Sequence, residues 1–255
     1  MSGMLAPEVL VLGGSGVVGR GIVAALLEAG SPVLAAARDP DRLQQLRDGF
    51  ADEPGLSILR GSVADDTSAA ALAADVALRP RPLSAVVASL GSPLQRGRMV
   101  DRPSDLLMQR LVDDVMPHLS AARHLLPLLG QGQRAGRYIL IGSPCALRPW
   151  SGHGDASVAA AATRMLAQVL HEEAQALGVR VQMLELAHPV CTPENASNAC
   201  SEWPSALGVG RSVVSLLDGG GDNRVIQRCD SLACTPPPRL LSGVVAQPDW
   251  LAAGA

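Results

Sequence analysis

The sequence predicts an α/β protein with one doubly wound parallel sheet of about seven strands and helices on both faces. Two observations support this fold class. Short runs rich in β-branched residues or Leu alternate with Ala-rich helical stretches through the first 227 residues, as in repeated βα units. The chain has 255 residues, of which 47% are hydrophobic, and this is enough to bury the core of one full-size domain.

Each element follows from a local pattern. The strands are expected at residues 8–12, 33–37, 57–59, 85–89, 137–141, 180–186 and 224–226. The helices are expected near residues 17–29, 40–48, 66–78, 104–129, 155–177 and 205–217. Gly30 and Gly178 stand where helices end, because glycine readily adopts the left-handed conformation of a helix C-terminus. The stretch RPRP at 79–82 is expected to stop the third helix.

The end of the chain has a different character. After Gln227 the alternation stops, and the remaining stretch contains three consecutive prolines and no clear period. Such a segment either lies irregularly on the body of the protein or is partly disordered. We therefore predict a single domain over residues 1–227, followed by an irregular tail over residues 228–255.

Composition excludes several classes of protein. The formal net charge of −3 and the pI of about 5.9 argue against nucleic acid and anionic membranes as partners. The five cysteines are scattered without a CxxC pair, which predicts reduced thiols, with no disulfide framework and no metal site. The first residues lack the pattern of a signal peptide, and no apolar run is long enough to span a bilayer. We expect a cytoplasmic protein.

The strongest motif is VLVLGGSGVVGRGI at 9–22, in which a strand leads through glycines into a helix. Gly13 permits a tight turn, Gly16 lets the backbone approach a pyrophosphate, and Gly19 lets the helix pack closely on the strand. Ser15 and Val18 lie in the same turn and are predicted to contact the cofactor with it. The motif predicts a Rossmann-type dinucleotide site; the alternative is a glycine-rich turn that binds no nucleotide.

The end of the second strand bears on which dinucleotide binds. Ala37 stands where NAD sites usually carry an acid for the ribose 2′-hydroxyl, and Arg38 follows it. A guanidinium suits a 2′-phosphate, so NADP(H) is favoured over NAD(H). Asp39 is expected to cap the helix that starts at Pro40 rather than to bind the ribose. The alternative for Arg38 is a solvated surface charge.

With these motifs, residues 8–227 resemble the short-chain dehydrogenase/reductase family. GGSGVVG is similar to the family's glycine motif, and VVASLG at 86–91 stands where the family has Asn-Asn-Ala-Gly. LVDDVMPHLSAARHLLPLL, GRYILIGSPCALRP and LGVRVQMLELAHPVCT resemble three further family segments. The resemblance implies a nicotinamide cofactor and a small-molecule substrate. It adds these residues to the predicted cofactor site: Ser62, Val63, Ser89, Gly91, Val190 and Thr192.

The catalytic residues of the family are mostly replaced. With Ala156 and Ser157 aligned, Gly154 takes the place of the catalytic Tyr and Val158 takes the place of the Lys. In the family, the Tyr exchanges the proton that accompanies hydride transfer, the Lys lowers the pKa of the Tyr and binds the ribose, and a Ser holds the substrate oxygen. Only the Ser is retained, as Ser143, while Asp114 stands in place of an Asn. The family's ordinary alcohol dehydrogenase mechanism therefore does not carry over.

Four residues are candidates for catalysis: Ser143, His153, Asp114 and His188. His153 directly precedes the vacated Tyr position, and a His can exchange protons near neutral pH. His188 stands where the family has a Gly beside the nicotinamide, and Asp114 is expected to point toward Ser143. Each also has a structural explanation, as a loop His bonded to backbone or as a helix acid that is solvated or bonded to a neighbouring backbone group.

Two segments bear on the substrate and the assembly. The loop 188–203 matches the family's variable substrate lid, in which Trp203 either caps the pocket or anchors the next helix. In the family, the helices corresponding to 104–129 and 155–177 pair with their copies in a second subunit, which implies a homodimer or homotetramer. The alternative for the alanines at 159–162 is that they simply pack on the sheet.

Three classes of function remain, in the following order. The first is an NADP(H)-dependent reductase with a nonstandard proton route, since some atypical members of the family lack the Tyr and reduce flavins or quinones. The second is a redox-neutral biosynthetic enzyme, such as an isomerase, dehydratase or cyclase, that uses the acid–base residues. The third is a non-catalytic NADP-binding sensor. The fold alone does not decide among them.

Overall fold

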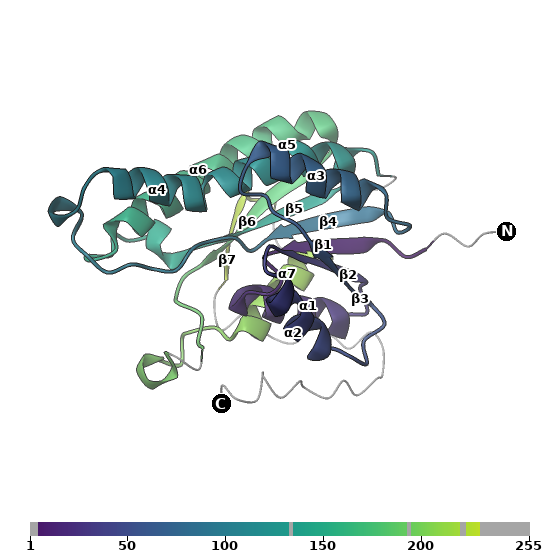
Figure 1. Ribbon diagram of the computed structural model, residues 1–255, viewed down its shortest axis with the longest axis horizontal. Helices are drawn as coiled ribbons and strands as arrows, with labels where there is room; N and C mark the ends of the chain where they lie inside the picture. The colour runs from purple at the N-terminus through teal and green to yellow at the C-terminus, as the bar shows by residue number, and fades with distance from the viewer. Residues whose placement is uncertain (1–4, 133–134, 193–194, 220–222, 230–255) are drawn as a thin grey trace.

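In the computed structural model, seven parallel strands form one sheet in the order β3-β2-β1-β4-β5-β6-β7 (Figure 1). The structure describes residues 5–132, 135–192, 195–219 and 223–229. The strands are β1 (Glu8–Leu12), β2 (Val33–Ala37), β3 (Leu56–Arg60), β4 (Leu83–Ala88), β5 (Arg137–Gly142), β6 (Arg180–Leu186) and β7 (Ile226–Cys229). The order confirms the predicted doubly wound sheet, because the chain starts in the middle, runs to one edge and then crosses to the other.

The central strand shows why these residues form a parallel sheet. All five residues of β1 are buried, and Leu10 pairs with Leu34 of β2 on one side and Val86 of β4 on the other. Helices cover both faces of such a sheet, so its inner strands are nearly continuous apolar runs. The strand order reverses between β1 and β4, and in folds of this kind the carboxyl ends of the strands at this point form the ligand crevice.

Helices cover the two faces of the sheet in separate layers (Figure 1). One layer contains α1 (Val17–Glu28), α2 (Pro40–Asp48) and α7 (Ala206–Leu217). The other contains α3 (Asp66–Ala77), α4 (Asp105–Asp114), α5 (Met116–Gly130) and α6 (Gly154–Ala174). Short 3-10 helices are η1 (Met99–Asp101), η2 (Pro144–Ala146), η3 (Gln175–Leu177) and η4 (Ala196–Asn198). Among the helices described, none combines the length and apolar character needed to cross a membrane.

Two cores follow from this layering. Ile22 and Val213 belong to the apolar cluster between the sheet and the α1–α7 layer. Leu72, Leu125 and Leu170 belong to the cluster on the opposite face. Gly30 and Gly178 have φ angles of 76° and 66° and follow α1 and η3, which confirms the two predicted helix ends.

Two sequence predictions about the elements require correction. The single helix expected at 104–129 is two helices, α4 and α5, with the break at Val115. Pro117 lies in the first turn of α5 and has no N–H to continue the hydrogen-bond ladder of α4, so a new helix starts there. The last strand runs over Ile226–Cys229 rather than 224–226, so the sheet continues past Gln227. The predicted tail lies outside the described residues from position 230 onward.

Candidate active site

The turn between β1 and α1 has room only for glycine at two of its positions. Gly13 has a φ of 72°, and a Cβ there would lie 2.1 Å from the carbonyl oxygen of Ser89 on the neighbouring strand end. A Cβ on Gly19 would lie 2.1 Å from the carbonyl oxygen of Gly13, so α1 starts directly against the turn. Gly16 caps α1, and its N–H donates to the Gly13 carbonyl at 2.9 Å. This is a cradle of the kind that brings backbone N–H groups against a phosphate.

A cleft of about 210 Å³ lies at the carboxyl ends of β1, β2 and β4, next to this turn. The predicted cofactor residues that line it are Gly13, Ser15, Gly16, Arg38, Ser62, Val63, Ser89 and Gly91. Val18 instead packs against the apolar core, and Gly19 lies under the turn. Val190 and Thr192 belong to the segment after β6. The sequence thus brings most of its predicted cofactor residues to one crevice.

The cleft has a basic end. Arg42 lines the cleft with Arg38, and its Nη2 donates to the carbonyl oxygen of Ser15 at 3.3 Å. Arg20 donates to the same oxygen through Nε at 3.2 Å, and its burial together with the charge of Arg42 lowers the pKa of Arg20. Asp39 accepts from the N–H groups of residues 41 and 42 at 3.0 and 3.2 Å, so it caps α2 as predicted. The sequence analysis did not single out Arg42. It is the third residue of α2, and the Asp39 cap places this first turn of the helix beside the cleft.

Ser143 ends β5 and caps the short helix η2. Its Oγ accepts a hydrogen bond from the backbone N–H of Cys145 at 3.3 Å, and the side chain is partly buried. Cys145 is buried, and this burial raises the pKa of its thiol. A protonated, buried thiol is typical of a cysteine that serves as a small core residue.

Met99 takes up the side-chain space at Gly154, the position that the family resemblance aligns with the catalytic Tyr. α6 begins at Gly154, and a Cβ at this residue would lie 2.5 Å from Sδ and 2.7 Å from Cγ of Met99. Met99 lies in η1, in the segment that connects β4 to α4. Val158, which the resemblance aligns with the family's lysine, is 42% exposed. The space beside the start of α6 is therefore bounded by the thioether of Met99.

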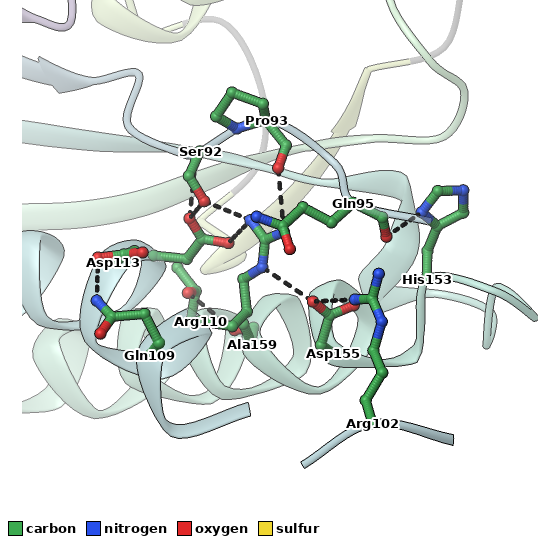
Figure 2. Close-up of polar contacts among 12 residues, drawn as sticks. Ser92, Pro93, Gln95, Arg102, Gln109, Arg110, Asp113, His153, Asp155 and Ala159 are labelled. Carbon is green, nitrogen blue, oxygen red and sulfur yellow. Dashed lines mark hydrogen bonds and ion pairs between the residues drawn. The ribbon is translucent and has the colours of Figure 1, made fainter. Parts of the chain in front are cut away.

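Asp114 is bonded to Ser92 and to Arg110 of its own helix. Its Oδ1 accepts from the N–H and hydroxyl of Ser92 at 2.9 and 2.6 Å, and its Oδ2 lies 3.2 Å from Nη1 of Arg110. Figure 2 shows Arg110 at the centre of this group, between Ser92 and Asp155. Both oxygens of Asp114 therefore have partners within this group, and its role beside Ser143 stays a prediction.

The two candidate histidines, His153 and His188, have different contact partners. His153 precedes α6, and its Nδ1 lies 3.1 Å from the carbonyl oxygen of Gln95, while its other ring nitrogen points away from this contact (Figure 2). His188 follows β6, and its Nε2 lies 3.9 Å from Oε2 of Glu202, a residue that the sequence analysis did not single out. The structure therefore gives each histidine a separate partner.

The start of the predicted lid is held by Asn195. Its Oδ1 accepts from the N–H of Thr192 at 2.7 Å, and its Nδ2 donates to the carbonyl of Val190 at 3.0 Å. The backbone N–H of Cys191 donates to the carbonyl of Pro204 at 2.9 Å. The contacts of Asn195 therefore hold Val190 and Thr192, the two predicted cofactor residues of this segment, relative to each other.

A buried histidine that the sequence did not reveal lies near the cleft. His118 is 2% exposed, follows the cleft-lining Pro117, and forms a hydrogen bond with the backbone of the cleft-lining Leu90. Burial lowers its pKa to about 4, against a smaller opposing effect of that hydrogen bond. The imidazole is therefore neutral at physiological pH and packs behind the cleft-lining residues Leu90 and Pro117.

Comparisons with known proteins agree with this geometry. The model of the short chain dehydrogenase family matches residues 7–198. A short chain dehydrogenase of Pseudocercospora fijiensis is 25% identical over 240 residues, which cover 92% of this chain and 77% of the relative.

Two solved structures share the fold. The Pseudomonas aeruginosa RhlG/NADP active-site complex is similar with a TM-score of 0.76 at 19% identity, over 91% of this chain and 98% of that chain. A short chain oxidoreductase from Pseudomonas aeruginosa PAO1, described as containing an atypical catalytic center, has a TM-score of 0.71 at 22% identity, over 83% and 90%. Since the family model matches most of the sequence, the protein belongs to the short chain dehydrogenase family.

Proposed function

We propose that the protein is an NADP(H)-dependent reductase whose acceptor needs no side-chain acid at position 154. One observation carries this proposal: most of the predicted cofactor residues line one cleft with Arg38 and Arg42, while Met99 fills the side-chain space at Gly154. Such a site keeps what a nicotinamide cofactor needs and lacks the family's proton donor. The acceptors that fit are conjugated ones, such as quinones, which spread the negative charge that hydride addition leaves.

The preference for NADP(H) rests on the charges at the cleft. Two guanidinium groups line it, and of the two acids that also line it, Asp113 and Asp39, Asp39 is engaged as the cap of α2. An arginine pair suits a 2′-phosphate, whereas a ribose 2′-hydroxyl is usually bound by an acid. A relative of the same fold is known as an NADP complex, which is in line with this preference.

The residues of the chain have separate roles in the proposed reaction. When bound, the nicotinamide supplies a hydride. The hydroxyl of Ser143 accepts from the N–H of Cys145, so its proton remains for the oxygen of the acceptor. His153 is held through Nδ1 by the carbonyl of Gln95 and presents its other ring nitrogen for proton exchange with water. Asp114 has a structural role, because Ser92 and Arg110 occupy its carboxylate.

We also propose that the protein acts in the cytoplasm and that it associates with further copies of itself. Val112, Met116, Leu119 and Leu177 are each about 40% or more exposed and line one groove of about 620 Å³ on the outer side of α4, α5 and η3. Exposed apolar side chains gathered in a groove favour association, so a homodimer or homotetramer through this face is proposed.

The test starts with nicotinamide fluorescence on titration with NADPH and NADH, followed by NADPH oxidation with benzoquinone against a protein-free control. We expect tighter binding of NADPH and protein-dependent oxidation that falls in Ser143→Ala. Binding without turnover on any quinone would favour the sensor function. Absence of binding would reject both the reductase and the sensor, and would leave redox-neutral chemistry.

A further inference from the structure

The segment between β4 and α4 is fastened to the start of α6. Residues 92–102 of this segment are called the strap here. The N–H of Gly97 donates to the carbonyl of Gly152 at 2.9 Å, and Gly97 pairs with His153 in an isolated parallel bridge. His153 adds its contact with the carbonyl of Gln95. The backbone bridge and the His153 contact therefore hold the middle of the strap against residues 152–153.

Both ends of the strap are held by arginines that meet at Asp155. Arg110 donates through Nη2 to the carbonyl of Pro93 at 3.0 Å and also contacts the hydroxyl of Ser92. Its Nε lies 3.3 Å from Oδ2 of Asp155 (Figure 2). At the other end, Arg102 bonds to the carbonyl of Arg96 and lies 4.0 Å from the same carboxylate oxygen. The strap is thus a fixed part of the site.

The fixed strap places Met99 over Gly154. The sulfur and Cγ of Met99 take up the space where any larger residue at position 154 would begin its side chain. A glycine in the first turn of a helix is an unfavourable choice, because glycine has a low helix propensity. The side chain of Met99 therefore occupies the space that the absence of a Cβ at Gly154 leaves.

Met99 also remains open to a ligand. Its side chain is 40% exposed, and the neighbouring surface of α6 presents Val158, which is 42% exposed. A thioether is polarizable and makes favourable contacts with aromatic rings, usually at the ring edge. This surface suits the edge of a flat, conjugated ring and offers no proton to it.

We propose that Met99 is a specificity-determining residue of this site. Its side chain fills the space that a side chain at position 154 would occupy, and so limits the size of the ring system that fits beside the start of α6. The inference deepens the proposed reductase function and rests on it. Shortening Met99 enlarges the site where the acceptor ring lies, while the cofactor cleft and Ser143 stay unchanged.

The first experiment compares Met99→Ala with wild type on benzoquinone and on the larger phenanthrenequinone, with NADPH as the donor. We expect the ratio of kcat/KM for the larger over the smaller quinone to rise roughly tenfold, as is typical when a pocket gains room for ring atoms. Val100→Ala is the matched control, because Val100 lies next in the strap and is 80% exposed. An unchanged ratio in Met99→Ala, or an equal rise in Val100→Ala, would overturn the proposal.

A second experiment does not depend on activity. The melting temperatures of Met99→Ala, Gly154→Ala and the double variant form a cycle. In wild type the new Cβ at position 154 meets Met99, whereas in Met99→Ala the alanine is free to stabilise the helix. We therefore expect Gly154→Ala to raise the melting temperature more in the Met99→Ala background than in wild type.

Together, the two experiments distinguish a wrong specificity proposal from a wrong reductase function. Additive effects in the cycle would show that Met99 does not fill position 154, and would overturn the specificity proposal even if quinones are reduced. Non-additive effects in a protein that oxidises no NADPH with any quinone would overturn the proposed reductase function and the specificity role that rests on it, and would retain only the contact between Met99 and position 154.

Discussion

Nε of Arg110 lies 3.3 Å from Oδ2 of Asp155, and this ion pair joins the middle of α4 to the first turn of α6. Both side chains are almost fully buried, at 5% and 9% exposure. Asp114 and Arg102 complete the cluster, so two carboxylates balance two guanidinium groups. A buried cluster of this kind is sensitive to the loss of one member, because the others are then left buried without compensation.

The first prediction concerns Asp155. Asp155→Asn keeps the shape of the side chain but removes a charge, which leaves Arg110 and Arg102 facing one carboxylate. We expect the free energy of unfolding to fall by about 3 kcal/mol, a typical cost for breaking a buried ion pair. Urea denaturation at neutral pH measures this change. Asp105→Asn is the matched control, because Asp105 lies in the first turn of α4 and is exposed. Equal effects of the two variants would contradict the role given to the cluster.

The second prediction concerns Arg42. Arg42→Gln removes a guanidinium from the basic end of the cleft, where it lies beside the Ser15 carbonyl. We expect NADPH to bind roughly tenfold more weakly, since a hydrogen bond to a charged group contributes about 1.5 kcal/mol. NADH, which lacks the 2′-phosphate, is expected to bind as before. Fluorescence titration of both nucleotides gives the comparison.

The control for Arg42 comes from the same helix. Arg47 lies in the last turn of α2 and is exposed, and it does not line the cleft. Arg47→Gln is expected to leave both affinities unchanged. If Arg42→Gln weakened NADH as much as NADPH, the guanidinium would contact a part common to both nucleotides, and the argument for NADP(H) would lose its support.

The sheet and the phosphate cradle could be predicted from the sequence because their signals are local. Each inner strand is a short apolar run, and the glycine spacing after β1 reflects contacts within a few residues, such as Gly19 against Gly13. Asp39 could be assigned to the helix cap for the same reason.

The remainder of the site depends on contacts that no local pattern marks. Arg110 and Asp155 are 45 residues apart, and Met99 meets Gly154 only because the strap crosses the start of α6. The expected direction of Asp114 rested on the family resemblance. The break at Val115 ends α4 at Asp114, whose carboxylate is bonded to Ser92 and Arg110.

The third prediction follows from the buried His118. Its pKa is about 4 in the folded protein and 6.5 as the ordinary value. The unfolded chain therefore binds a proton between pH 6.5 and 4 that the folded protein does not. Stability from this group is complete above pH 6.5, falls as the pH is lowered and levels off below about 4. At pH 5 the loss is roughly 2 kcal/mol relative to pH 7.

The variant His118→Asn removes this titration and keeps a donor for the backbone of Leu90. Urea unfolding at pH 7 and pH 5 should show a smaller loss of stability in the variant than in wild type. His124→Asn serves for comparison, since His124 lies on the same helix but is 25% exposed. A variant that loses as much stability as wild type between the two pH values would show that His118 is not the group responsible.

The last prediction concerns the apolar groove along α4, α5 and η3. Leu119 is 39% exposed and lies among the lining residues, so Leu119→Arg places a charge where a second copy of the chain is proposed to pack. Removing a charge from water into such an interface costs several kcal/mol in desolvation, which is enough to dissociate a dimer at micromolar concentration. Sedimentation velocity should therefore show an oligomer for wild type and a monomer for the variant.

Leu78→Arg is the control, because Leu78 is 85% exposed at the end of α3 and does not line the groove. A monomeric wild type, or a Leu119→Arg variant that still sediments as the oligomer, would place the interface elsewhere or remove it.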